Sequence, residues 1–230
     1  MRVRSVVLPA VLAIAAAVLA PTTAQAATKC SLVMPTKVVV DARTVETPIA
    51  LSTGCYTPDR ADHAYWDLEH GGTVYYSLDF ESEDLEQGPG ADWTIPWEDS
   101  DPMGRWIARG YEAPASGGLL DQNTTVTTVK YGSKLTTKVT RAGSKLSWAV
   151  TATQWSGRAH KNVARAKASV GLFHKAPGSD TWTYVKSVTT SSTGRATVSL
   201  ATPKAGSYRL KVGETPAVWA SYSPIVQGRR

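Results

Sequence analysis

The stretch HAYWDLEHGGTVYYSLDF, residues 63–80, alternates bulky apolar side chains with polar ones on both sides of a paired glycine. Ala64, Trp66 and Leu68 share one face of an extended chain, because successive side chains of a strand point to opposite faces. Gly71-Gly72 favours the tight turn of a two-residue hairpin. The return strand continues the alternation with Val74, Tyr76, Leu78 and Phe80. The stretch predicts a β-hairpin with one buried face.

The same alternation recurs along the rest of the chain. The apolar sets are Trp93/Ile95/Trp97, Trp106/Ala108, Leu146/Trp148/Val150/Ala152, Ala168/Val170/Leu172, Trp182/Tyr184, Ala196/Val198/Leu200 and Tyr208/Leu210/Val212. This periodicity places Trp148 and Trp182 in a core. Turns rich in Gly, Pro and Ser separate the sets at short spacing, with no amphipathic helix between them. The pattern predicts an all-β chain folded as an antiparallel sandwich.

The length and a weak internal similarity favour two domains. The 230 residues minus a leader of 26 leave 204, which suffice for one large or two small domains. GRWIARG at 104–110 parallels GSYRLKVG at 206–213. We expect a signal peptide at 1–26, an acidic sandwich at 27–121, a linker at 122–133 and a basic sandwich at 134–230. A single larger sandwich with a long hairpin is the alternative.

Charge divides the chain in the same place. Residues 27–121 hold six basic and 17 acidic side chains, a formal charge of −11. Residues 122–230 hold 17 basic and two acidic side chains, a formal charge of +15. The whole-chain value of +6 therefore averages two unlike halves.

The N-terminus has the features of an export signal. Arg2 and Arg4 precede an apolar run at residues 6–20, and Ala24-Gln25-Ala26 supplies the small residues that signal peptidase requires. We expect cleavage after Ala26 and a secreted, extracellular protein, free or associated with the cell wall. The alternative is a membrane anchor, for which 15 residues are short against a hydrocarbon core of ~30 Å.

Cys30 and Cys55 are the two cysteines of the sequence. Oxidising surroundings outside the cell favour a disulfide between them. Closing a loop of roughly 25 residues stabilises a domain by about 3 kcal/mol in the chain-entropy account. Two free buried thiols are the alternative.

Four patterns in the second half carry a family resemblance: YGSKLT at 131–136, Trp182 after the turn at 177–179, residues 189–194 followed by Arg195, and GSYR at 206–209. With them, residues 131–230 resemble the small immunoglobulin-like modules of secreted actinobacterial proteins, and the first half is similar in outline. The resemblance implies two tandem immunoglobulin-like β-sandwiches that act as binding or spacer domains without catalytic residues.

Motifs for catalysis or for metal and cofactor binding do not emerge from the sequence. His63, His70, His160 and His174 have no metal-ligand spacing. The sequence has no Gly-x-Ser-x-Gly nucleophile elbow and no phosphate-binding glycine loop. We therefore expect no catalytic residue, no metal, no cofactor and no enzymatic activity.

Carboxylates keep two other hypotheses open. They gather at Asp79, Glu81, Glu83, Asp84 and Glu86, and again at Glu98, Asp99 and Asp101. A small secreted hydrolase would need two of them opposed across a cleft at about 5–10 Å. Residues 99–104 half match an EF-hand loop, but Met103 and Gly110 stand where ligands belong, so only an irregular calcium site is conceivable.

The basic half suggests the main functional hypothesis. Lys and Arg beside Trp148, Trp155, Trp182 and Trp219 would suit nucleic acid, but an exported protein more often meets anionic wall polymers or lipid surfaces. We expect no specific nucleic-acid partner and no membrane span. The protein would bind anionic envelope material through its second domain and an unidentified protein through Tyr65, Tyr75 and the acidic loop of the first. A competing interpretation of the basic half is internal: the acidic and basic domains would contact and neutralise one another across their interface.

Overall fold

The computed structural model describes residues 29–56, 63–88, 91–111, 113–115 and 118–228. The predicted signal peptide and its cleavage site after Ala26 lie outside these ranges. Within them, no helix has the length and apolar character needed to cross a bilayer.

The described chain is built mostly of strands, so the all-β prediction is confirmed. Its buried apolar residues form two clusters, and we call the strands around each cluster a domain. The elements of the first domain are β1 (Lys29–Cys30), β2 (Leu32–Val33), β3 (Lys37–Val40), β4 (Thr44–Leu51), the 3₁₀ turn η1 (Thr53–Tyr56), β5 (His63–His70), β6 (Thr73–Glu81), α1 (Ser82–Glu86), β7 (Trp93–Glu98), β8 (Gly104–Gly110), β9 (Ala113–Ala115), β10 (Gly118–Gln122) and β11 (Thr124–Tyr131). Those of the second are β12 (Ser133–Ala142), β13 (Lys145–Ser156), β14 (Lys161–Ala164), β15 (Ser169–Lys175), β16 (Thr183–Thr189), β17 (Arg195–Leu200), β18 (Ser207–Val212), β19 (Ser221–Tyr222) and β20 (Val226–Gln227).

Two sheets face each other in the first domain. One has the order β3-β11-β8-β5-β6 and the other β2-β4-β7, while β1, β10 and β9 form a small third sheet. The pairs β3–β11 and β1–β10 are parallel, and the other strand pairs of this domain are antiparallel as predicted. In both parallel pairs, an N-terminal strand joins one of the last strands of the domain.

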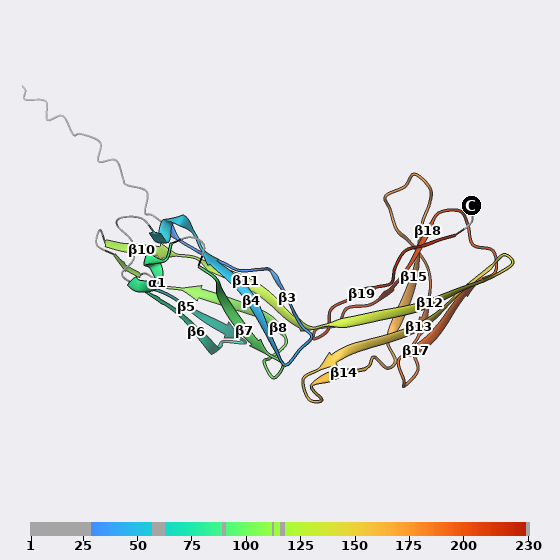
Figure 1. Ribbon diagram of the computed structural model, residues 1–230, viewed down its shortest axis with the longest axis horizontal. Helices are drawn as coiled ribbons and strands as arrows, with labels where there is room; N and C mark the ends of the chain where they lie inside the picture. Colours follow the sequence, from blue (N-terminus) through green and yellow to red (C-terminus); the bar gives the residue numbers. More distant parts are fainter. Residues whose placement is uncertain (1–28, 57–62, 89–90, 112, 116–117, 229–230) are drawn as a thin grey trace, which may run out of the picture.

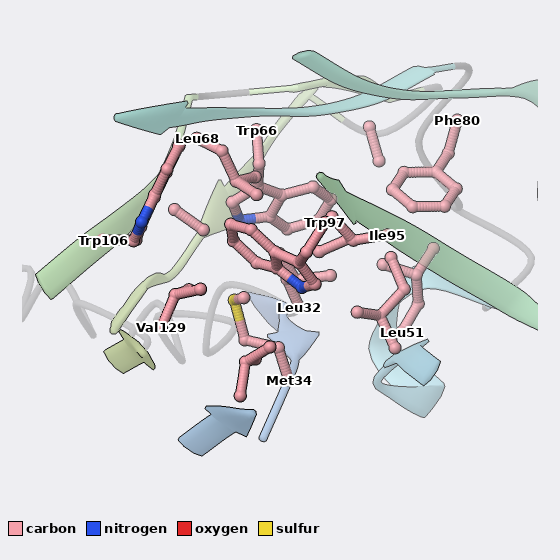
Figure 2. Packing of buried hydrophobic residues seen from close by; sticks show 14 of the residues in the cluster. Leu32, Met34, Leu51, Trp66, Leu68, Phe80, Ile95, Trp97, Trp106 and Val129 are labelled. Carbon is pink, nitrogen blue, oxygen red and sulfur yellow. The ribbon is translucent and has the colours of Figure 1, made fainter. Parts of the chain in front are cut away.

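Tryptophans fill the space between these sheets (Figure 2). Trp66, Trp97 and Trp106 are fully buried. The rings of Trp97 and Trp106 meet edge to face with centroids 5.0 Å apart, an arrangement that aromatic pairs favour. The predicted alternation in residues 63–69, 93–97 and 106–108 therefore does put these rings on the inner faces.

The hairpin of residues 63–80 forms as β5 and β6. Gly71 and Gly72 both have positive φ, 59° and 84°, which glycine adopts without a steric penalty. The pairing register shifts between Leu68 and Glu69. Val74 lies beyond this irregularity and is 47% exposed, so its expected place on the buried face is wrong.

Cys30 and Cys55 form a disulfide, as predicted. Both residues are fully buried in the first domain's core. The bond ties β1 to η1, which directly follows β4.

Residues 124–131, expected within a linker, form β11 instead. β11 pairs with β8 on one side and with β3 on the other, so it lies inside the larger sheet of the first domain. Val129 is fully buried there. Only Gly132 separates β11 from β12. Residues 124–129 are all Thr or Val, and such β-branched residues favour a strand.

The second domain is also two sheets around one core. β13 pairs with β12, β14 and β17, and β18 pairs with β15, β19 and β20, with β16 beside β15. The buried residues between the sheets are Leu135, Leu146, Trp148, Val150, Ala152, Val170, Leu172, Val198, Tyr208, Leu210 and Val212. The prediction that Trp148 is a core residue is thus confirmed.

Trp182, expected in the core beside Trp148, is instead partly exposed. It precedes β16, and Tyr184 at the start of that strand is 60% exposed. The pairing of β15 with β16 is irregular between Leu172 and Phe173. This irregularity offsets the alternation, so both aromatic side chains point to the outer face.

The two domains lie end to end along the long axis of the molecule (Figure 1), and a buried carboxylate sits where they meet. Asp99, 3% exposed, accepts hydrogen bonds from Trp155 Nε1 at 3.1 Å and pairs with His160 Nδ1 at 2.8 Å. Trp155 comes from β13 of the second domain but is part of the first domain's core cluster. A Cβ on Gly157 would lie 2.0 Å from the Asp99 carbonyl oxygen, so only glycine permits this approach.

A second set of contacts reinforces this joint from the C-terminal side. Trp219 Nε1 donates to the Val38 carbonyl oxygen at 2.7 Å, and the ammonium groups of Lys37 and Lys130 lie over its ring. The hydroxyl of Tyr131 donates to the Asp99 carbonyl oxygen at 2.9 Å. Burial, followed by the charge of Asp99, raises the pKa of Tyr131. These contacts make the junction a packed interface rather than a linker.

Candidate functional site

The outer face of the sheet containing β15, β18 and β19 carries cations alternating with aromatic rings. Tyr208, Leu210 and Val212 of β18 are buried in the core. Arg209 and Lys211, between them in sequence, therefore point outward, because strand side chains alternate. Tyr222 lies opposite Lys211 on the neighbouring strand.

Five side chains form what we call the cation–aromatic row: Lys175, Trp182, Arg209, Tyr222 and Lys211. The Arg209 guanidinium is 4.1 Å from the centroid of the Trp182 ring and 4.8 Å from that of Tyr222. Lys175 Nζ lies 5.7 Å from the Trp182 centroid, and Lys211 Nζ lies 5.5 Å from the Tyr222 centroid. All four distances are within the reach of cation–π attraction.

Stacking fixes the cations without neutralising them. Arg209 Nε is buried and has no hydrogen-bond partner among the described residues. The ion pairs formed in the described part of the chain include none of the three cations of the row. All three cations of the row are partly exposed.

A shallow hollow of about 330 Å³ adjoins the row. Phe173, Tyr184, Ser187 and Lys211 contribute to its lining. The rings of Phe173 and Tyr184 meet edge to face at 5.9 Å. The cationic row thus borders an aromatic surface on an open sheet face, which suits an extended ligand better than an enclosed small molecule.

The predicted acidic loop is not a loop. Asp79 belongs to β6 and pairs with His63 at 3.0 Å, while residues 82–86 form α1. The Asp84 carboxylate accepts the backbone N–H of Glu81 at the start of that helix. These carboxylates serve strand pairing and helix capping.

The second acidic group also has structural partners. Thr44 Oγ1 donates to Glu98 at 3.0 Å, and Asp99 is buried at the domain joint. Asp101 accepts the hydroxyl of Tyr76 at 2.6 Å; burial and this bond raise the pKa of Tyr76. Among the residues that the structure describes, no three His, Cys, Asp or Glu side chains gather as a metal site.

Tyr65 and Tyr75, nominated as contacts, both lie on the outside of the first domain. The Tyr65 hydroxyl donates to Asp67 at 2.6 Å, and Tyr111 donates to the other oxygen of that carboxylate at 2.9 Å. Burial alone would raise the pKa of Asp67, but bonds from Tyr65, Tyr111 and Ser77 outweigh it, so the pKa lies below its ordinary value. Tyr75 is 47% exposed and rests on Trp106.

Arg209 and Tyr222 are not among the residues that the sequence patterns nominate, and the apolar periodicity wrongly places Trp182 in the core. One signal was present: Arg209 and Lys211 occupy the alternate positions of an apolar strand, which predicts two cations on one outer face. Their stacking on Trp182 and Tyr222 depends on pairing between distant segments, which the periodicity does not specify.

No family model and no curated protein matches the sequence. Among solved structures, the chain is similar to the D00-D0 domain of Intimin, with 14% identity and a TM-score of 0.30 over 87% of this chain and 100% of that one. It is also similar to the FN1-FN3 domains of chicken CNTN1, with 12% identity and a TM-score of 0.31 over 87% and 66%. A third similar structure is the calcium binding domain CBD12 of CALX1.1, with 14% identity and a TM-score of 0.28 over 79% of this chain and 78% of that one.

Proposed function

We propose that this protein is a secreted, non-enzymatic binding module that holds an anionic extracellular polymer on the cation–aromatic row of its second domain. The observation that carries the proposal is Arg209, whose guanidinium lies over the rings of Trp182 and Tyr222 and forms no ion pair among the described residues. Lys175 and Lys211 extend the same row on either side.

Preorganisation supports affinity at this face. A flexible Lys or Arg loses side-chain entropy when it binds, and a cation already held against a ring loses less. A guanidinium that lies over aromatic rings keeps its positive charge, and the planar fork of a guanidinium matches the geometry of a carboxylate. A polymer with repeated carboxylates would engage all three cations at once.

The charge of the surrounding domain supports the same ligand class. Residues 122–230 carry a formal charge of +15, and such a field attracts polyanions before contact. Glu214, one of the two acidic residues in that range, is paired with Lys130 at the domain joint. Basic side chains therefore far outnumber carboxylates in this half of the chain.

Extracellular placement is part of the proposal. The export signal of residues 1–26 and the buried disulfide both suit an oxidising compartment. The resemblance of residues 131–230 to secreted actinobacterial modules supports a cell-envelope polymer as the ligand.

Calorimetric titration with polygalacturonate, a linear polyuronate, tests this function. We expect Arg209→Ala to weaken binding about tenfold or more, because a hydrogen bond to a charged group contributes roughly 1.5–3 kcal/mol. Lys138→Ala is the matched control: Lys138 is exposed on β12, in the other sheet. Equal affinities of the two variants, or equal binding of the fully methyl-esterified polymer, would refute the proposal.

A further inference from the structure

The opposite charges of the two domains remain largely apart within one molecule. The domains meet at their ends, so their broad sheet faces do not cover one another (Figure 1). Among the described residues, two acid–base pairs, His160–Asp99 and Lys130–Glu214, join the two domains. Neutralisation of the −11 and +15 halves inside one chain is thus slight.

The first domain has a surface of aromatic rings and carboxylates that is complementary in charge to the cation–aromatic row. We call it the tyrosine–carboxylate face, and it consists of His63, Tyr65, Asp67, Asp79 and Tyr111. The rings of His63 and Tyr65 stack at 6.1 Å, and those of Tyr65 and Tyr111 lie 5.6 Å apart. Tyr111 is 44% exposed, and the Asp79 side chain is 49% exposed.

Buried Asp67 holds this face in place. Its two oxygens accept the hydroxyls of Tyr65 and Tyr111, and Ser77 Oγ donates to it at 2.9 Å. Both phenol rings are therefore fixed by a carboxylate that stays ionised at neutral pH. Tyrosine faces attract Lys and Arg, and nearby carboxylates strengthen that attraction.

We propose that the cation–aromatic row of one copy docks on the tyrosine–carboxylate face of a second copy. Charge complementarity selects this occupant, because the row and the face lie on different domains of an end-to-end molecule and their signs are opposite. The inference rests on the proposed binding role of the row, so polymer and second copy compete for Arg209. Contact between unlike faces closes into a pair when two copies lie antiparallel and otherwise extends into chains.

Sedimentation velocity of the full chain at about 20 mM and about 1 M salt tests this contact, since screening is weak in the first and strong in the second. We expect association at low salt that is lost at high salt. Asp79→Lys should weaken association about tenfold or more, because it places like charges in contact. Asp121→Lys makes the same charge change on β10, where the side chain is 57% exposed, and should sediment as the wild type.

Polymer binding of the same variants separates this inference from the proposed function. Asp79→Lys should bind polygalacturonate as the wild type does, whereas Arg209→Ala should lose both association and polymer binding. A wild-type chain that binds polymer but stays monomeric at low salt would overturn the self-association alone. Equal loss of association in Asp79→Lys and Asp121→Lys would also overturn the proposed self-association. A wild-type chain that associates but does not bind polymer would overturn the proposed function alone.

Discussion

At the scale of single residues, the acidic side chains of the first domain serve mainly as fixed acceptors. Asp67 receives three hydroxyl donors, and Asp99 receives Trp155 while pairing with His160. A buried carboxylate is stable only when such partners replace its hydration. The sequence showed these residues as acids near aromatics, but it did not reveal that hydroxyl and indole donors would surround them.

The depressed pKa of Asp67 predicts a pH-dependent contribution to stability. Its ionised form is favoured in the folded state, so this contribution is present above the unfolded pKa of about 3.9 and is lost as pH falls through the lower folded pKa. Asp67→Asn should therefore lower the free energy of unfolding more at pH 7 than at pH 2. Urea unfolding at both values measures this, and a difference that does not change with pH would contradict it.

At the scale of elements, the two faces of β18 have separate roles. Leu210 is fully buried in the second core, and Arg209 next to it stacks on the outside. Leu210→Ala should lower the free energy of unfolding by about 2–5 kcal/mol, because it leaves a cavity. Arg209→Ala should cost about 1 kcal/mol or less, in line with surface changes and a lost cation–π contact. Guanidinium unfolding compares them, and a larger loss for Arg209→Ala would contradict this division.

The disulfide gives a second prediction for an element. The double variant Cys30→Ser/Cys55→Ser should lose about 3 kcal/mol of unfolding free energy, since the cross-link restricts the unfolded chain. Chemical unfolding under oxidising conditions measures the loss. Reductant should reproduce it in the wild type and leave the double variant unchanged; a wild type insensitive to full reduction would contradict the account.

Individual strands were predictable where one face is uniformly apolar. Residues 63–70, 93–98, 145–152 and 207–212 alternate cleanly, and each forms the strand expected. Irregular pairing beside Glu69 and Phe173 was not predictable, and it moved Val74 and Trp182 to the outside. β11 was not predicted because its threonines break the alternation of apolar and polar residues. Its burial comes from pairing with β3 and β8, which lie in distant parts of the sequence.

At the scale of the whole molecule, the joint couples the two domains. Trp155 of β13 is 9% exposed and packs into the first domain's core, next to the close contact of Gly157 with Asp99. The linker expected at residues 122–133 and the charge neutralisation expected between the domains both concern the geometry of this junction. The junction is built from residues far apart in the chain, so sequence patterns do not predict it. The functional site was predictable only as a basic second domain.

Trp155→Ala tests this coupling. Removing a buried tryptophan should lower stability by about 3–5 kcal/mol and should split one cooperative unfolding transition into two. Differential scanning calorimetry of the full chain measures both effects. Trp182→Ala is the matched control, because Trp182 lies outside the core, and it should leave a single transition. A single transition in Trp155→Ala would contradict the coupling.

The central claim is that Arg209, Trp182 and Tyr222 form the contact surface for an anionic polymer. Its most direct test is an NMR titration of the isotope-labelled full chain with polygalacturonate, following backbone amides together with the Trp182 indole and Arg209 Nε–H signals. The account predicts that the largest shifts fall on β15, β18 and β19 around these side chains and that they vanish at high salt. Shifts centred on the opposite sheet of β12, β13 and β17, or spread evenly over the basic domain, would contradict it.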